Sequence, residues 1–167
     1  MDRDRLWKGI QDGIITRVGT DHIPYTREVK LKKGFWDAIV GVGDGHYVLL
    51  PLMFSEGVNK GRINLDTLRQ LLCENPAKTF GIYPQKGTLN IGADADVVII
   101  DPHKEFVVDY KESESSIEYS IYQGWKIKGM PVATFVNGYL VAENMKIVDE
   151  TPHGKLVRHN PKGAKLV

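Results

Sequence analysis

Asp21 and His22 are the first residues of the chain whose types and position could do chemistry. They lie in the segment Thr20-Asp21-His22-Ile23-Pro24, which follows a short apolar run and ends in a proline. This arrangement is expected where a strand ends and presents side chains to a pocket. A carboxylate in such a place can bind a cation or accept a proton. Taken alone, an Asp-His pair at a strand end more often shapes a turn or caps a helix.

A glycine-rich segment forms a second candidate site. Gly41, Gly43 and Gly45 fall within five residues, and glycine lets the main chain come close to a ligand or to another segment. The spacing does not match the G-x-G-x-x-G pattern of a dinucleotide fingerprint. Main-chain contact with a ligand is therefore the chemistry that this segment predicts.

The other reactive side chains give weaker signals. Cys73 lies near the apolar stripe of a predicted helix, so we expect a small core residue and not a nucleophile. Asp94 and Asp96 occur in Gly-Ala-Asp-Ala-Asp, which is typical of a turn that leads into a strand. Four further histidines lack the spacing of metal ligands and are expected at the surface: His46, His103, His153 and His159.

The elements that position these residues are mainly helical in the first half. Residues 4–13 predict a helix that Gly13 terminates, and residues 14–19 predict a strand, which together make half of an α/β repeat. Residues 48–58 predict a buried helix. Residues 65–74 predict another helix that Asn64 caps and Asn75-Pro76 breaks.

After Pro84 the sequence pattern predicts strands where the first half predicts mainly helices. Residues 97–100 and 106–108 are two short β-rich runs, and residues 132–142 contain Asn137-Gly138 between two more, which favours a two-residue hairpin. Residues 111–120 are polar and predict a surface connection. The basic tail from Thr151 has little core of its own and is expected to pack along a neighbouring surface or to be mobile.

Composition narrows the class of protein. Of 167 residues, 22 are Lys or Arg and 21 are Asp or Glu, so the charge balance gives no reason to expect nucleic acid or a membrane as partner. One cysteine excludes an intramolecular disulfide, the polar N-terminus does not resemble a signal peptide, and no apolar run is long enough to span a bilayer. We expect a cytoplasmic protein that acts on small molecules or proteins.

The ordered motifs together resemble the C-terminal part of the cyclic amidohydrolases, the family of hydantoinase, dihydropyrimidinase, allantoinase and dihydroorotase. The resemblance runs from about residue 6 to about residue 148 and is much more specific than any single motif. It is carried by Leu6-Trp7, Gly13-Ile14-Ile15, Gly19-Thr20-Asp21-His22-Ile23-Pro24, Leu50-Pro51-Leu52, Phe54-Ser55-Glu56-Gly57-Val58, Gly61-Arg62-Ile63, Asn75-Pro76-Ala77-Lys78, Phe80-Gly81, Lys86-Gly87-Thr88, Gly92-Ala93-Asp94-Ala95-Asp96 and Asp101-Pro102.

The resemblance implies a fold, a reaction and a metal. The family fold is a metal-dependent (β/α)8 barrel joined to a β-sandwich built from both ends of the chain, so the expected fold class is α/β plus β. Asp21 would follow the eighth barrel strand, bind a divalent metal and move the proton of the attacking water. The reaction is hydrolysis of a C–N bond in a small cyclic amide or ureide. The complete enzyme would hold two metal ions, with zinc expected.

The glycine-rich segment departs from the family pattern. Many members have a Glu where this chain has Tyr47, and hydantoinases commonly have an Asn near Gly41 whose main chain holds the substrate ring. Main-chain contact could survive the change, so Gly41 and Gly43 remain the expected substrate-binding residues. The identity of the ring is left open.

Length limits what the chain can do by itself. A complete barrel needs about 200 to 250 residues, and the family's other metal ligands have no counterparts here. We expect the C-terminal third of an amidohydrolase: residues 1–85 from the barrel, residues 86–150 as sandwich strands, and residues 151–167 as a basic tail. Whether this is a truncated product, a fragment or one of two polypeptides stays open.

Two functional hypotheses follow from this length. In the first, the chain completes a cyclic amidohydrolase together with a complementary N-terminal polypeptide or in a homo-oligomer, while the isolated chain binds no metal and is inactive. In the second, it is a non-catalytic remnant or an assembly module. In both, strands that lack their covering elements would leave an apolar face and an open edge.

Overall fold

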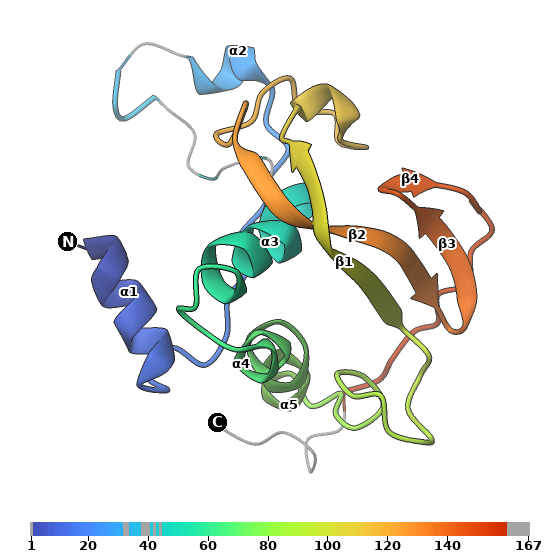
Figure 1. The fold of residues 1–167 in the computed structure, drawn as a ribbon. Coiled ribbons are helices and arrows are strands. Elements are labelled where there is room, and N and C mark those ends of the chain that lie inside the picture. The colour runs from blue at the N-terminus through green and yellow to red at the C-terminus, as the bar shows by residue number, and fades with distance from the viewer. Residues whose placement is uncertain (1, 32–33, 38–40, 42, 44, 160–167) are drawn as a thin grey trace.

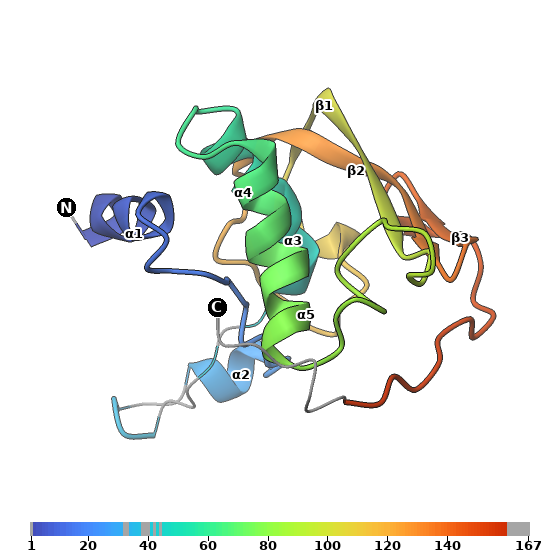
Figure 2. The ribbon, with the colours of Figure 1, turned by 90° about the horizontal axis from the view of Figure 1, so that it is seen from below.

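The fold consists of helices packed on one face of an antiparallel sheet. The computed structural model describes residues 2–31, 34–37, 41, 43 and 45–159. Figure 1 shows the helices of the first half beside the long strands of the second half, with α1 standing apart at the edge of the molecule. The view from below in Figure 2 places α3 between the sheet and the long helix that contains α4 and α5. Residues 160–167 of the expected tail lie outside the described residues.

The first helix agrees with its prediction, but the strand expected after it does not form. Helix α1 spans Asp2–Gln11, and Gly13 follows it with φ of +71°, a conformation that suits glycine after a helix end. Residues 14–19, all of which the structure describes, form no strand. A strand needs a neighbour to complete its hydrogen bonds, and this segment lies beside a helix instead: the N–H of Val18 donates to the carbonyl of Leu71 at 3.4 Å.

The predicted buried helix at residues 48–58 is confirmed and starts slightly earlier. Helix α3 spans Gly45–Met53 and continues directly into the π-helical turn η1, Phe54–Val58. Val48 is fully buried and Phe54 nearly so, as expected for a helix with apolar residues on most of its surface. The ring of Phe54 lies against Gly129 of the sheet, where an added Cβ would come within 2.2 Å of the ring.

The next helix is capped as predicted but is not broken at Asn75-Pro76. Helix α4 spans Leu65–Arg69, the π-helical turn η2 spans Gln70–Glu74 and α5 spans Asn75–Thr79, so the helix runs through the proline. The Asn64 side chain accepts a hydrogen bond from the N–H of Thr67 at 2.8 Å. The N–H of Asn75 bonds to the carbonyl of Gln70, five residues back. This wider turn accommodates the proline ring, which would clash in a regular α-helix.

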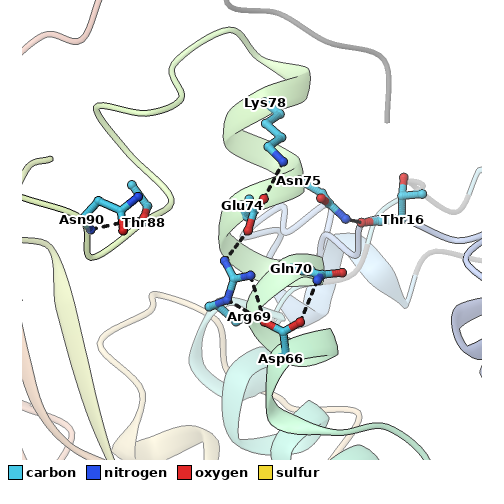
Figure 3. A network of polar contacts seen from close by, with 9 residues as sticks. All are labelled: Thr16, Asp66, Arg69, Gln70, Glu74, Asn75, Lys78, Thr88 and Asn90. Atoms are coloured by element: carbon cyan, nitrogen blue, oxygen red, sulfur yellow. Dashed lines mark hydrogen bonds and ion pairs between the residues drawn. The ribbon is translucent and has the colours of Figure 1, made fainter.

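Charged side chains form a network on the solvent side of this helix. Figure 3 shows Asp66, Arg69, Glu74 and Lys78 linked in sequence along it. Hydrogen bonds from Lys78 and Arg69 hold the pKa of Glu74 below its usual range. The network therefore favours the ionised form of the Glu74 carboxylate.

The second half forms one antiparallel sheet in the order β1-β2-β3-β4. Strand β1 spans Val97–Val107, β2 spans Lys126–Val136, β3 spans Tyr139–Glu143 and β4 spans Lys146–Ile147. The two short strands expected at residues 97–100 and 106–108 are one strand with an irregular middle, and Val108 lies just beyond it. The Asp101 carboxylate accepts from the N–H groups of His103 and Lys104, which bridges that irregularity.

The predicted hairpin is confirmed. Asn137 and Gly138 connect β2 to β3 with φ of +50° and +86°, the signs required by a type I′ turn. On its other side β1 pairs with no strand among the described residues. Val98 and Ile99, which point to opposite faces of β1, are both about half exposed.

Two apolar clusters hold the helices to the sheet. The larger joins α1, α3 and the long helix, and its buried members are Ile10, Met53, Phe54, Ile63, Leu68 and Leu71. The smaller joins Val48 of α3 to Val108 and Ile127 of the sheet region. The short helix α2, Arg27–Lys30, and the 3-10 turn η3, Tyr110–Glu112, lie outside both clusters. Within the described ranges, no helix is long and apolar enough to cross a membrane.

Candidate functional site

Asp21 lies in an exposed loop that the long helix holds in place. Asn75 donates from its side-chain amide to the carbonyl of Thr16 at 2.8 Å, and Asp21 follows five residues later. Asp21 has φ of +48°, which Asp adopts more readily than most residues. The hydroxyl of Thr20 accepts a hydrogen bond from the N–H of His22 at 3.2 Å. The carboxylate of Asp21 is therefore presented at the surface by a shaped turn and not by a strand end.

The glycine-rich segment packs directly on the Asp21 loop. An added Cβ at Gly45 would lie 2.2 Å from the Cβ of Thr20, and one at Gly41 would lie 2.7 Å from a methyl group of Ile23. No real Cβ makes such contacts, so these positions require glycine. Positions 42 and 44 lie outside the described residues. The two candidate segments are thus brought together, as one site requires.

Side chains of this chain already engage the main chain of the two glycines predicted to bind substrate. The ammonium group of Lys30 donates to the carbonyl of Gly41 at 2.7 Å. The N–H of Gly43 donates to the hydroxyl oxygen of Tyr119 at 3.5 Å. Gly43 is buried, and an added Cβ would lie 2.4 Å from Ile117. Close packing against the chain itself therefore accounts for part of the need for glycine here.

The structure also pairs two histidines that the sequence treated separately. The Nδ1 atoms of His22 and His46 lie 3.4 Å apart, and their rings meet edge to face with centroids 4.3 Å apart. His46 lies in the first turn of α3, and His22 directly follows Asp21 in its loop. Sequence spacing gave no signal for this contact, because 24 residues separate the two. His46 is exposed, as expected, and the structure adds its contact with the ring of His22.

The described residues do not fit the two-metal centre implied by the family resemblance. Such a centre needs several protein ligands, and within the described part of the chain no three side chains of His, Cys, Asp or Glu are grouped to hold a metal ion. Asp21 offers one carboxylate. The arrangement can accept a proton or contribute one ligand, and it cannot build a metal centre alone.

The remaining candidates fall into structural roles. Asp94 and Asp96 both form ion pairs with Lys86, with 2.9 Å between Lys86 Nζ and Asp94 Oδ2, and they lie directly before β1, as expected for a segment that leads into a strand. His103 and His159 are exposed, as expected. His153 is not an ordinary surface residue, because its ring stacks on Tyr139 with centroids 4.0 Å apart and its Nε2 lies 2.7 Å from Asp149.

Cys73 does not lie in the core. It is exposed and lines a groove of about 870 Å³ between the long helix and β1. Partial burial raises the pKa of its thiol, which disfavours the nucleophilic thiolate. The prediction that Cys73 is buried was wrong, whereas its proposed lack of nucleophilic function stands as a prediction.

Comparison with known proteins places this chain in a family. The model of the amidohydrolase family matches residues 1–141. The chain belongs to the amidohydrolase family.

The individual relatives are hydantoinases. The L-hydantoinase of Paenarthrobacter aurescens is 41% identical over 165 residues, which are 96% of this chain and 36% of that protein. The D-hydantoinase of Ralstonia pickettii is 34% identical over 94% of this chain and 35% of its own length. The structure of D-hydantoinase (dihydropyrimidinase) from Thermus sp. matches with a TM-score of 0.89 and 32% identity, over 95% of this chain and 35% of that chain. The chain thus spans about a third of the length of these relatives.

Proposed function

We propose that this chain supplies the Asp21 portion of a cyclic amidohydrolase that hydrolyses a C–N bond in a cyclic amide or ureide. The observation that carries the proposal is the close packing of the Asp21 loop on the glycine-rich segment. It brings the loop that carries Asp21 against a segment whose glycines, Gly41 and Gly45, leave the main chain accessible at those positions. The hydantoinase names of the relatives support a hydantoin-type ring as the substrate class.

In this proposal Asp21 moves a proton. Water adds to the ring carbonyl carbon, the C–N bond breaks, and the departing nitrogen takes a proton. A carboxylate at this position accepts the proton from water and returns it to the nitrogen. Divalent metals, which the family generally uses, would be held mainly by residues outside this chain.

The proposal also assigns a place in the complete enzyme to three parts of the chain. Residues 1–85 would belong to the C-terminal part of a barrel, residues 86–150 to a β-sandwich, and residues 151–167 to a tail. Two features support this assignment. Residues 14–19 form no strand, and one edge of β1 pairs with no other described strand, so each segment could pair with a strand that this chain does not supply. A complementary N-terminal polypeptide, or further copies of the chain, would provide them.

The test combines the chain with a complementary N-terminal polypeptide and measures metal content and hydantoin hydrolysis. Asp21→Asn should lower turnover by at least about 100-fold, as expected for loss of a general base. Asp12→Asn is the matched control, because Asp12 is also exposed and its only described partner is Lys8. Full activity of the Asp21→Asn assembly would refute the role of Asp21.

A second candidate function is a non-catalytic assembly module. The groove of about 870 Å³ beside β1 favours it, because apolar side chains such as Leu50, Leu72 and Ile100 line the groove. In that case the chain would associate with its partner through this surface, and the Asp21→Asn and wild-type assemblies would be equally inactive. Sedimentation of the chain alone should then show self-association, and a stable monomer would argue against the module.

A further inference from the structure

A separate cavity of about 400 Å³ lies between α2 and the connection from β1 to β2. In Figure 1 these two segments are neighbours at one end of the molecule. The walls that matter are Arg27, Lys30, Tyr110, Glu118, Tyr119 and Gln123. A cavity of this volume is at the lower end of the range for small-molecule sites. We call it the Arg27 cavity.

The Arg27 cavity shares two residues with the glycine-rich segment. Lys30 holds the carbonyl of Gly41, and Tyr119 accepts from the N–H of Gly43. Those two contacts fix one wall. Gln123, which also lines the cavity, accepts from the N–H of Tyr110 at 3.0 Å and donates to Asp109 at 3.3 Å. The cavity is therefore preformed and lies next to the proposed reaction site.

Arg27 and Glu118 place charges of opposite sign at this cavity. Throughout the described residues, the guanidinium of Arg27 and the carboxylate of Glu118 make no ion pair and no side-chain hydrogen bond. The hydroxyl of Tyr119 accepts from Gly43, so it can still donate its own hydrogen. The rings of Tyr110 and Tyr119 add apolar surface. A ligand that satisfies all of these groups needs a carboxylate, N–H donors and an apolar body.

We propose that the Arg27 cavity binds an N-carbamoyl amino acid, the ring-opened form of a hydantoin. The carboxylate would pair with Arg27, whose planar fork suits a carboxylate, with Lys30 nearby. The ureido N–H groups would donate to Glu118, and the amino-acid side chain would lie against the tyrosine rings. The negative charge of Glu118 disfavours binding of a carboxylate ligand that has no N–H groups to donate to it. This inference rests on the proposed function for the identity of the ligand.

The chemistry explains why such a cavity would recognise product over substrate. Ring opening adds the water oxygen to the ring carbonyl, which becomes a carboxylate, and breaks its bond to nitrogen. That nitrogen takes a proton and becomes the terminal ureido group. The closed ring carries no carboxylate for Arg27, whereas the opened product carries one.

Isothermal titration of the complete 167-residue chain tests the proposal with three probes: N-carbamoyl-phenylalanine, 3-phenylpropionate and 5-benzylhydantoin. The first should bind best, the second about tenfold more weakly, and the closed ring least. Arg27→Ala should weaken the binding of N-carbamoyl-phenylalanine by at least tenfold, and Arg27→Lys should weaken it by less. Glu118→Gln should weaken the binding of N-carbamoyl-phenylalanine and should not weaken the binding of 3-phenylpropionate.

Arg5→Ala is the matched control, because Arg5 is exposed on α1 and does not line the cavity. Circular dichroism and thermal melts establish that each variant keeps its fold. Equal binding by wild type and Arg27→Ala, or equal binding of the closed and opened rings, would overturn the proposal. Its failure is distinct from failure of the proposed function, because the Asp21→Asn assembly is read by turnover and this site is read by binding.

Discussion

Asn75 of the long helix and Thr16 of the segment before Asp21 are joined by a hydrogen bond of 2.8 Å from a side-chain amide to a main-chain carbonyl. Asn75 is buried, and Figure 3 shows its side chain directed at Thr16. Helix and loop are thereby coupled through one polar contact across 59 residues of sequence. The position of Asp21 depends on this contact, because no strand ladder supports residues 14–19.

Asn75→Ala should lower the free energy of unfolding by about 1 to 3 kcal/mol, since it leaves the partly buried carbonyl of Thr16 without its partner. Urea denaturation measures this loss. Hydrogen exchange should also speed up at Val18, whose N–H bonds to the same helix. Asn90→Ala is the control, because the side chain of Asn90 makes no hydrogen bond among the described residues. Equal stability of Asn75→Ala and Asn90→Ala would contradict the coupling.

Gly129→Ala should destabilise the chain more than Gly124→Ala. Both glycines have positive φ, +102° and +80°, so alanine strains the main chain at both positions. Only Gly129 is packed against Phe54, whereas nothing lies within 4 Å of an added Cβ at Gly124. The extra cost of overpacking is about 1 to 3 kcal/mol. Paired urea titrations give this difference, and identical midpoints would show that Gly129 of the sheet and Phe54 of η1 are not in close contact.

The stability that Asp149 contributes should disappear in acid. Hydrogen bonds from His153 and Thr151 lower the pKa of Asp149 from 3.8 to about 2. Because the folded pKa lies below the unfolded value, the unfolded chain binds more protons in this interval. The contribution is therefore complete above about pH 4 and is lost as the pH falls through 2.

Thermal melts of wild type and Asp149→Asn between pH 6 and pH 2.5 measure this effect. The wild type should melt higher near pH 6, and the two melting temperatures should converge as the pH falls. A difference that stays constant across the range would mean that the ionised carboxylate does not stabilise the fold.

Local patterns were predicted well because the residues that determine them are adjacent. Asn137-Gly138 accounts for its own turn, and Asn64 caps its helix with an N–H three residues away. The helices around Ile10 and Val48 follow from apolar spacing alone. In each case the decisive contacts lie within a few residues of one another.

Predictions that depended on distant partners were less successful. Residues 14–19 have the composition of a strand, but a strand forms only when a neighbour completes its ladder. Pro76 was expected to end a helix, and the π-helical turn before it removed the conflict. The contact between His22 and His46 and the Arg27 cavity join segments far apart in sequence, so no spacing rule could have found them.

The π-helical turn η2 also sets the angular position of everything that follows it. Its hydrogen bonds reach five residues back, so it contains about one residue more than an α-turn. Each residue of an α-helix rotates the chain by about 100°. Deleting one residue between Gln70 and Glu74 would therefore turn Asn75 away from Thr16 by about 100° and would set the ring of Pro76 against the preceding turn of the helix. A single deletion at this turn would thus disconnect the Asp21 loop from the helix that positions it.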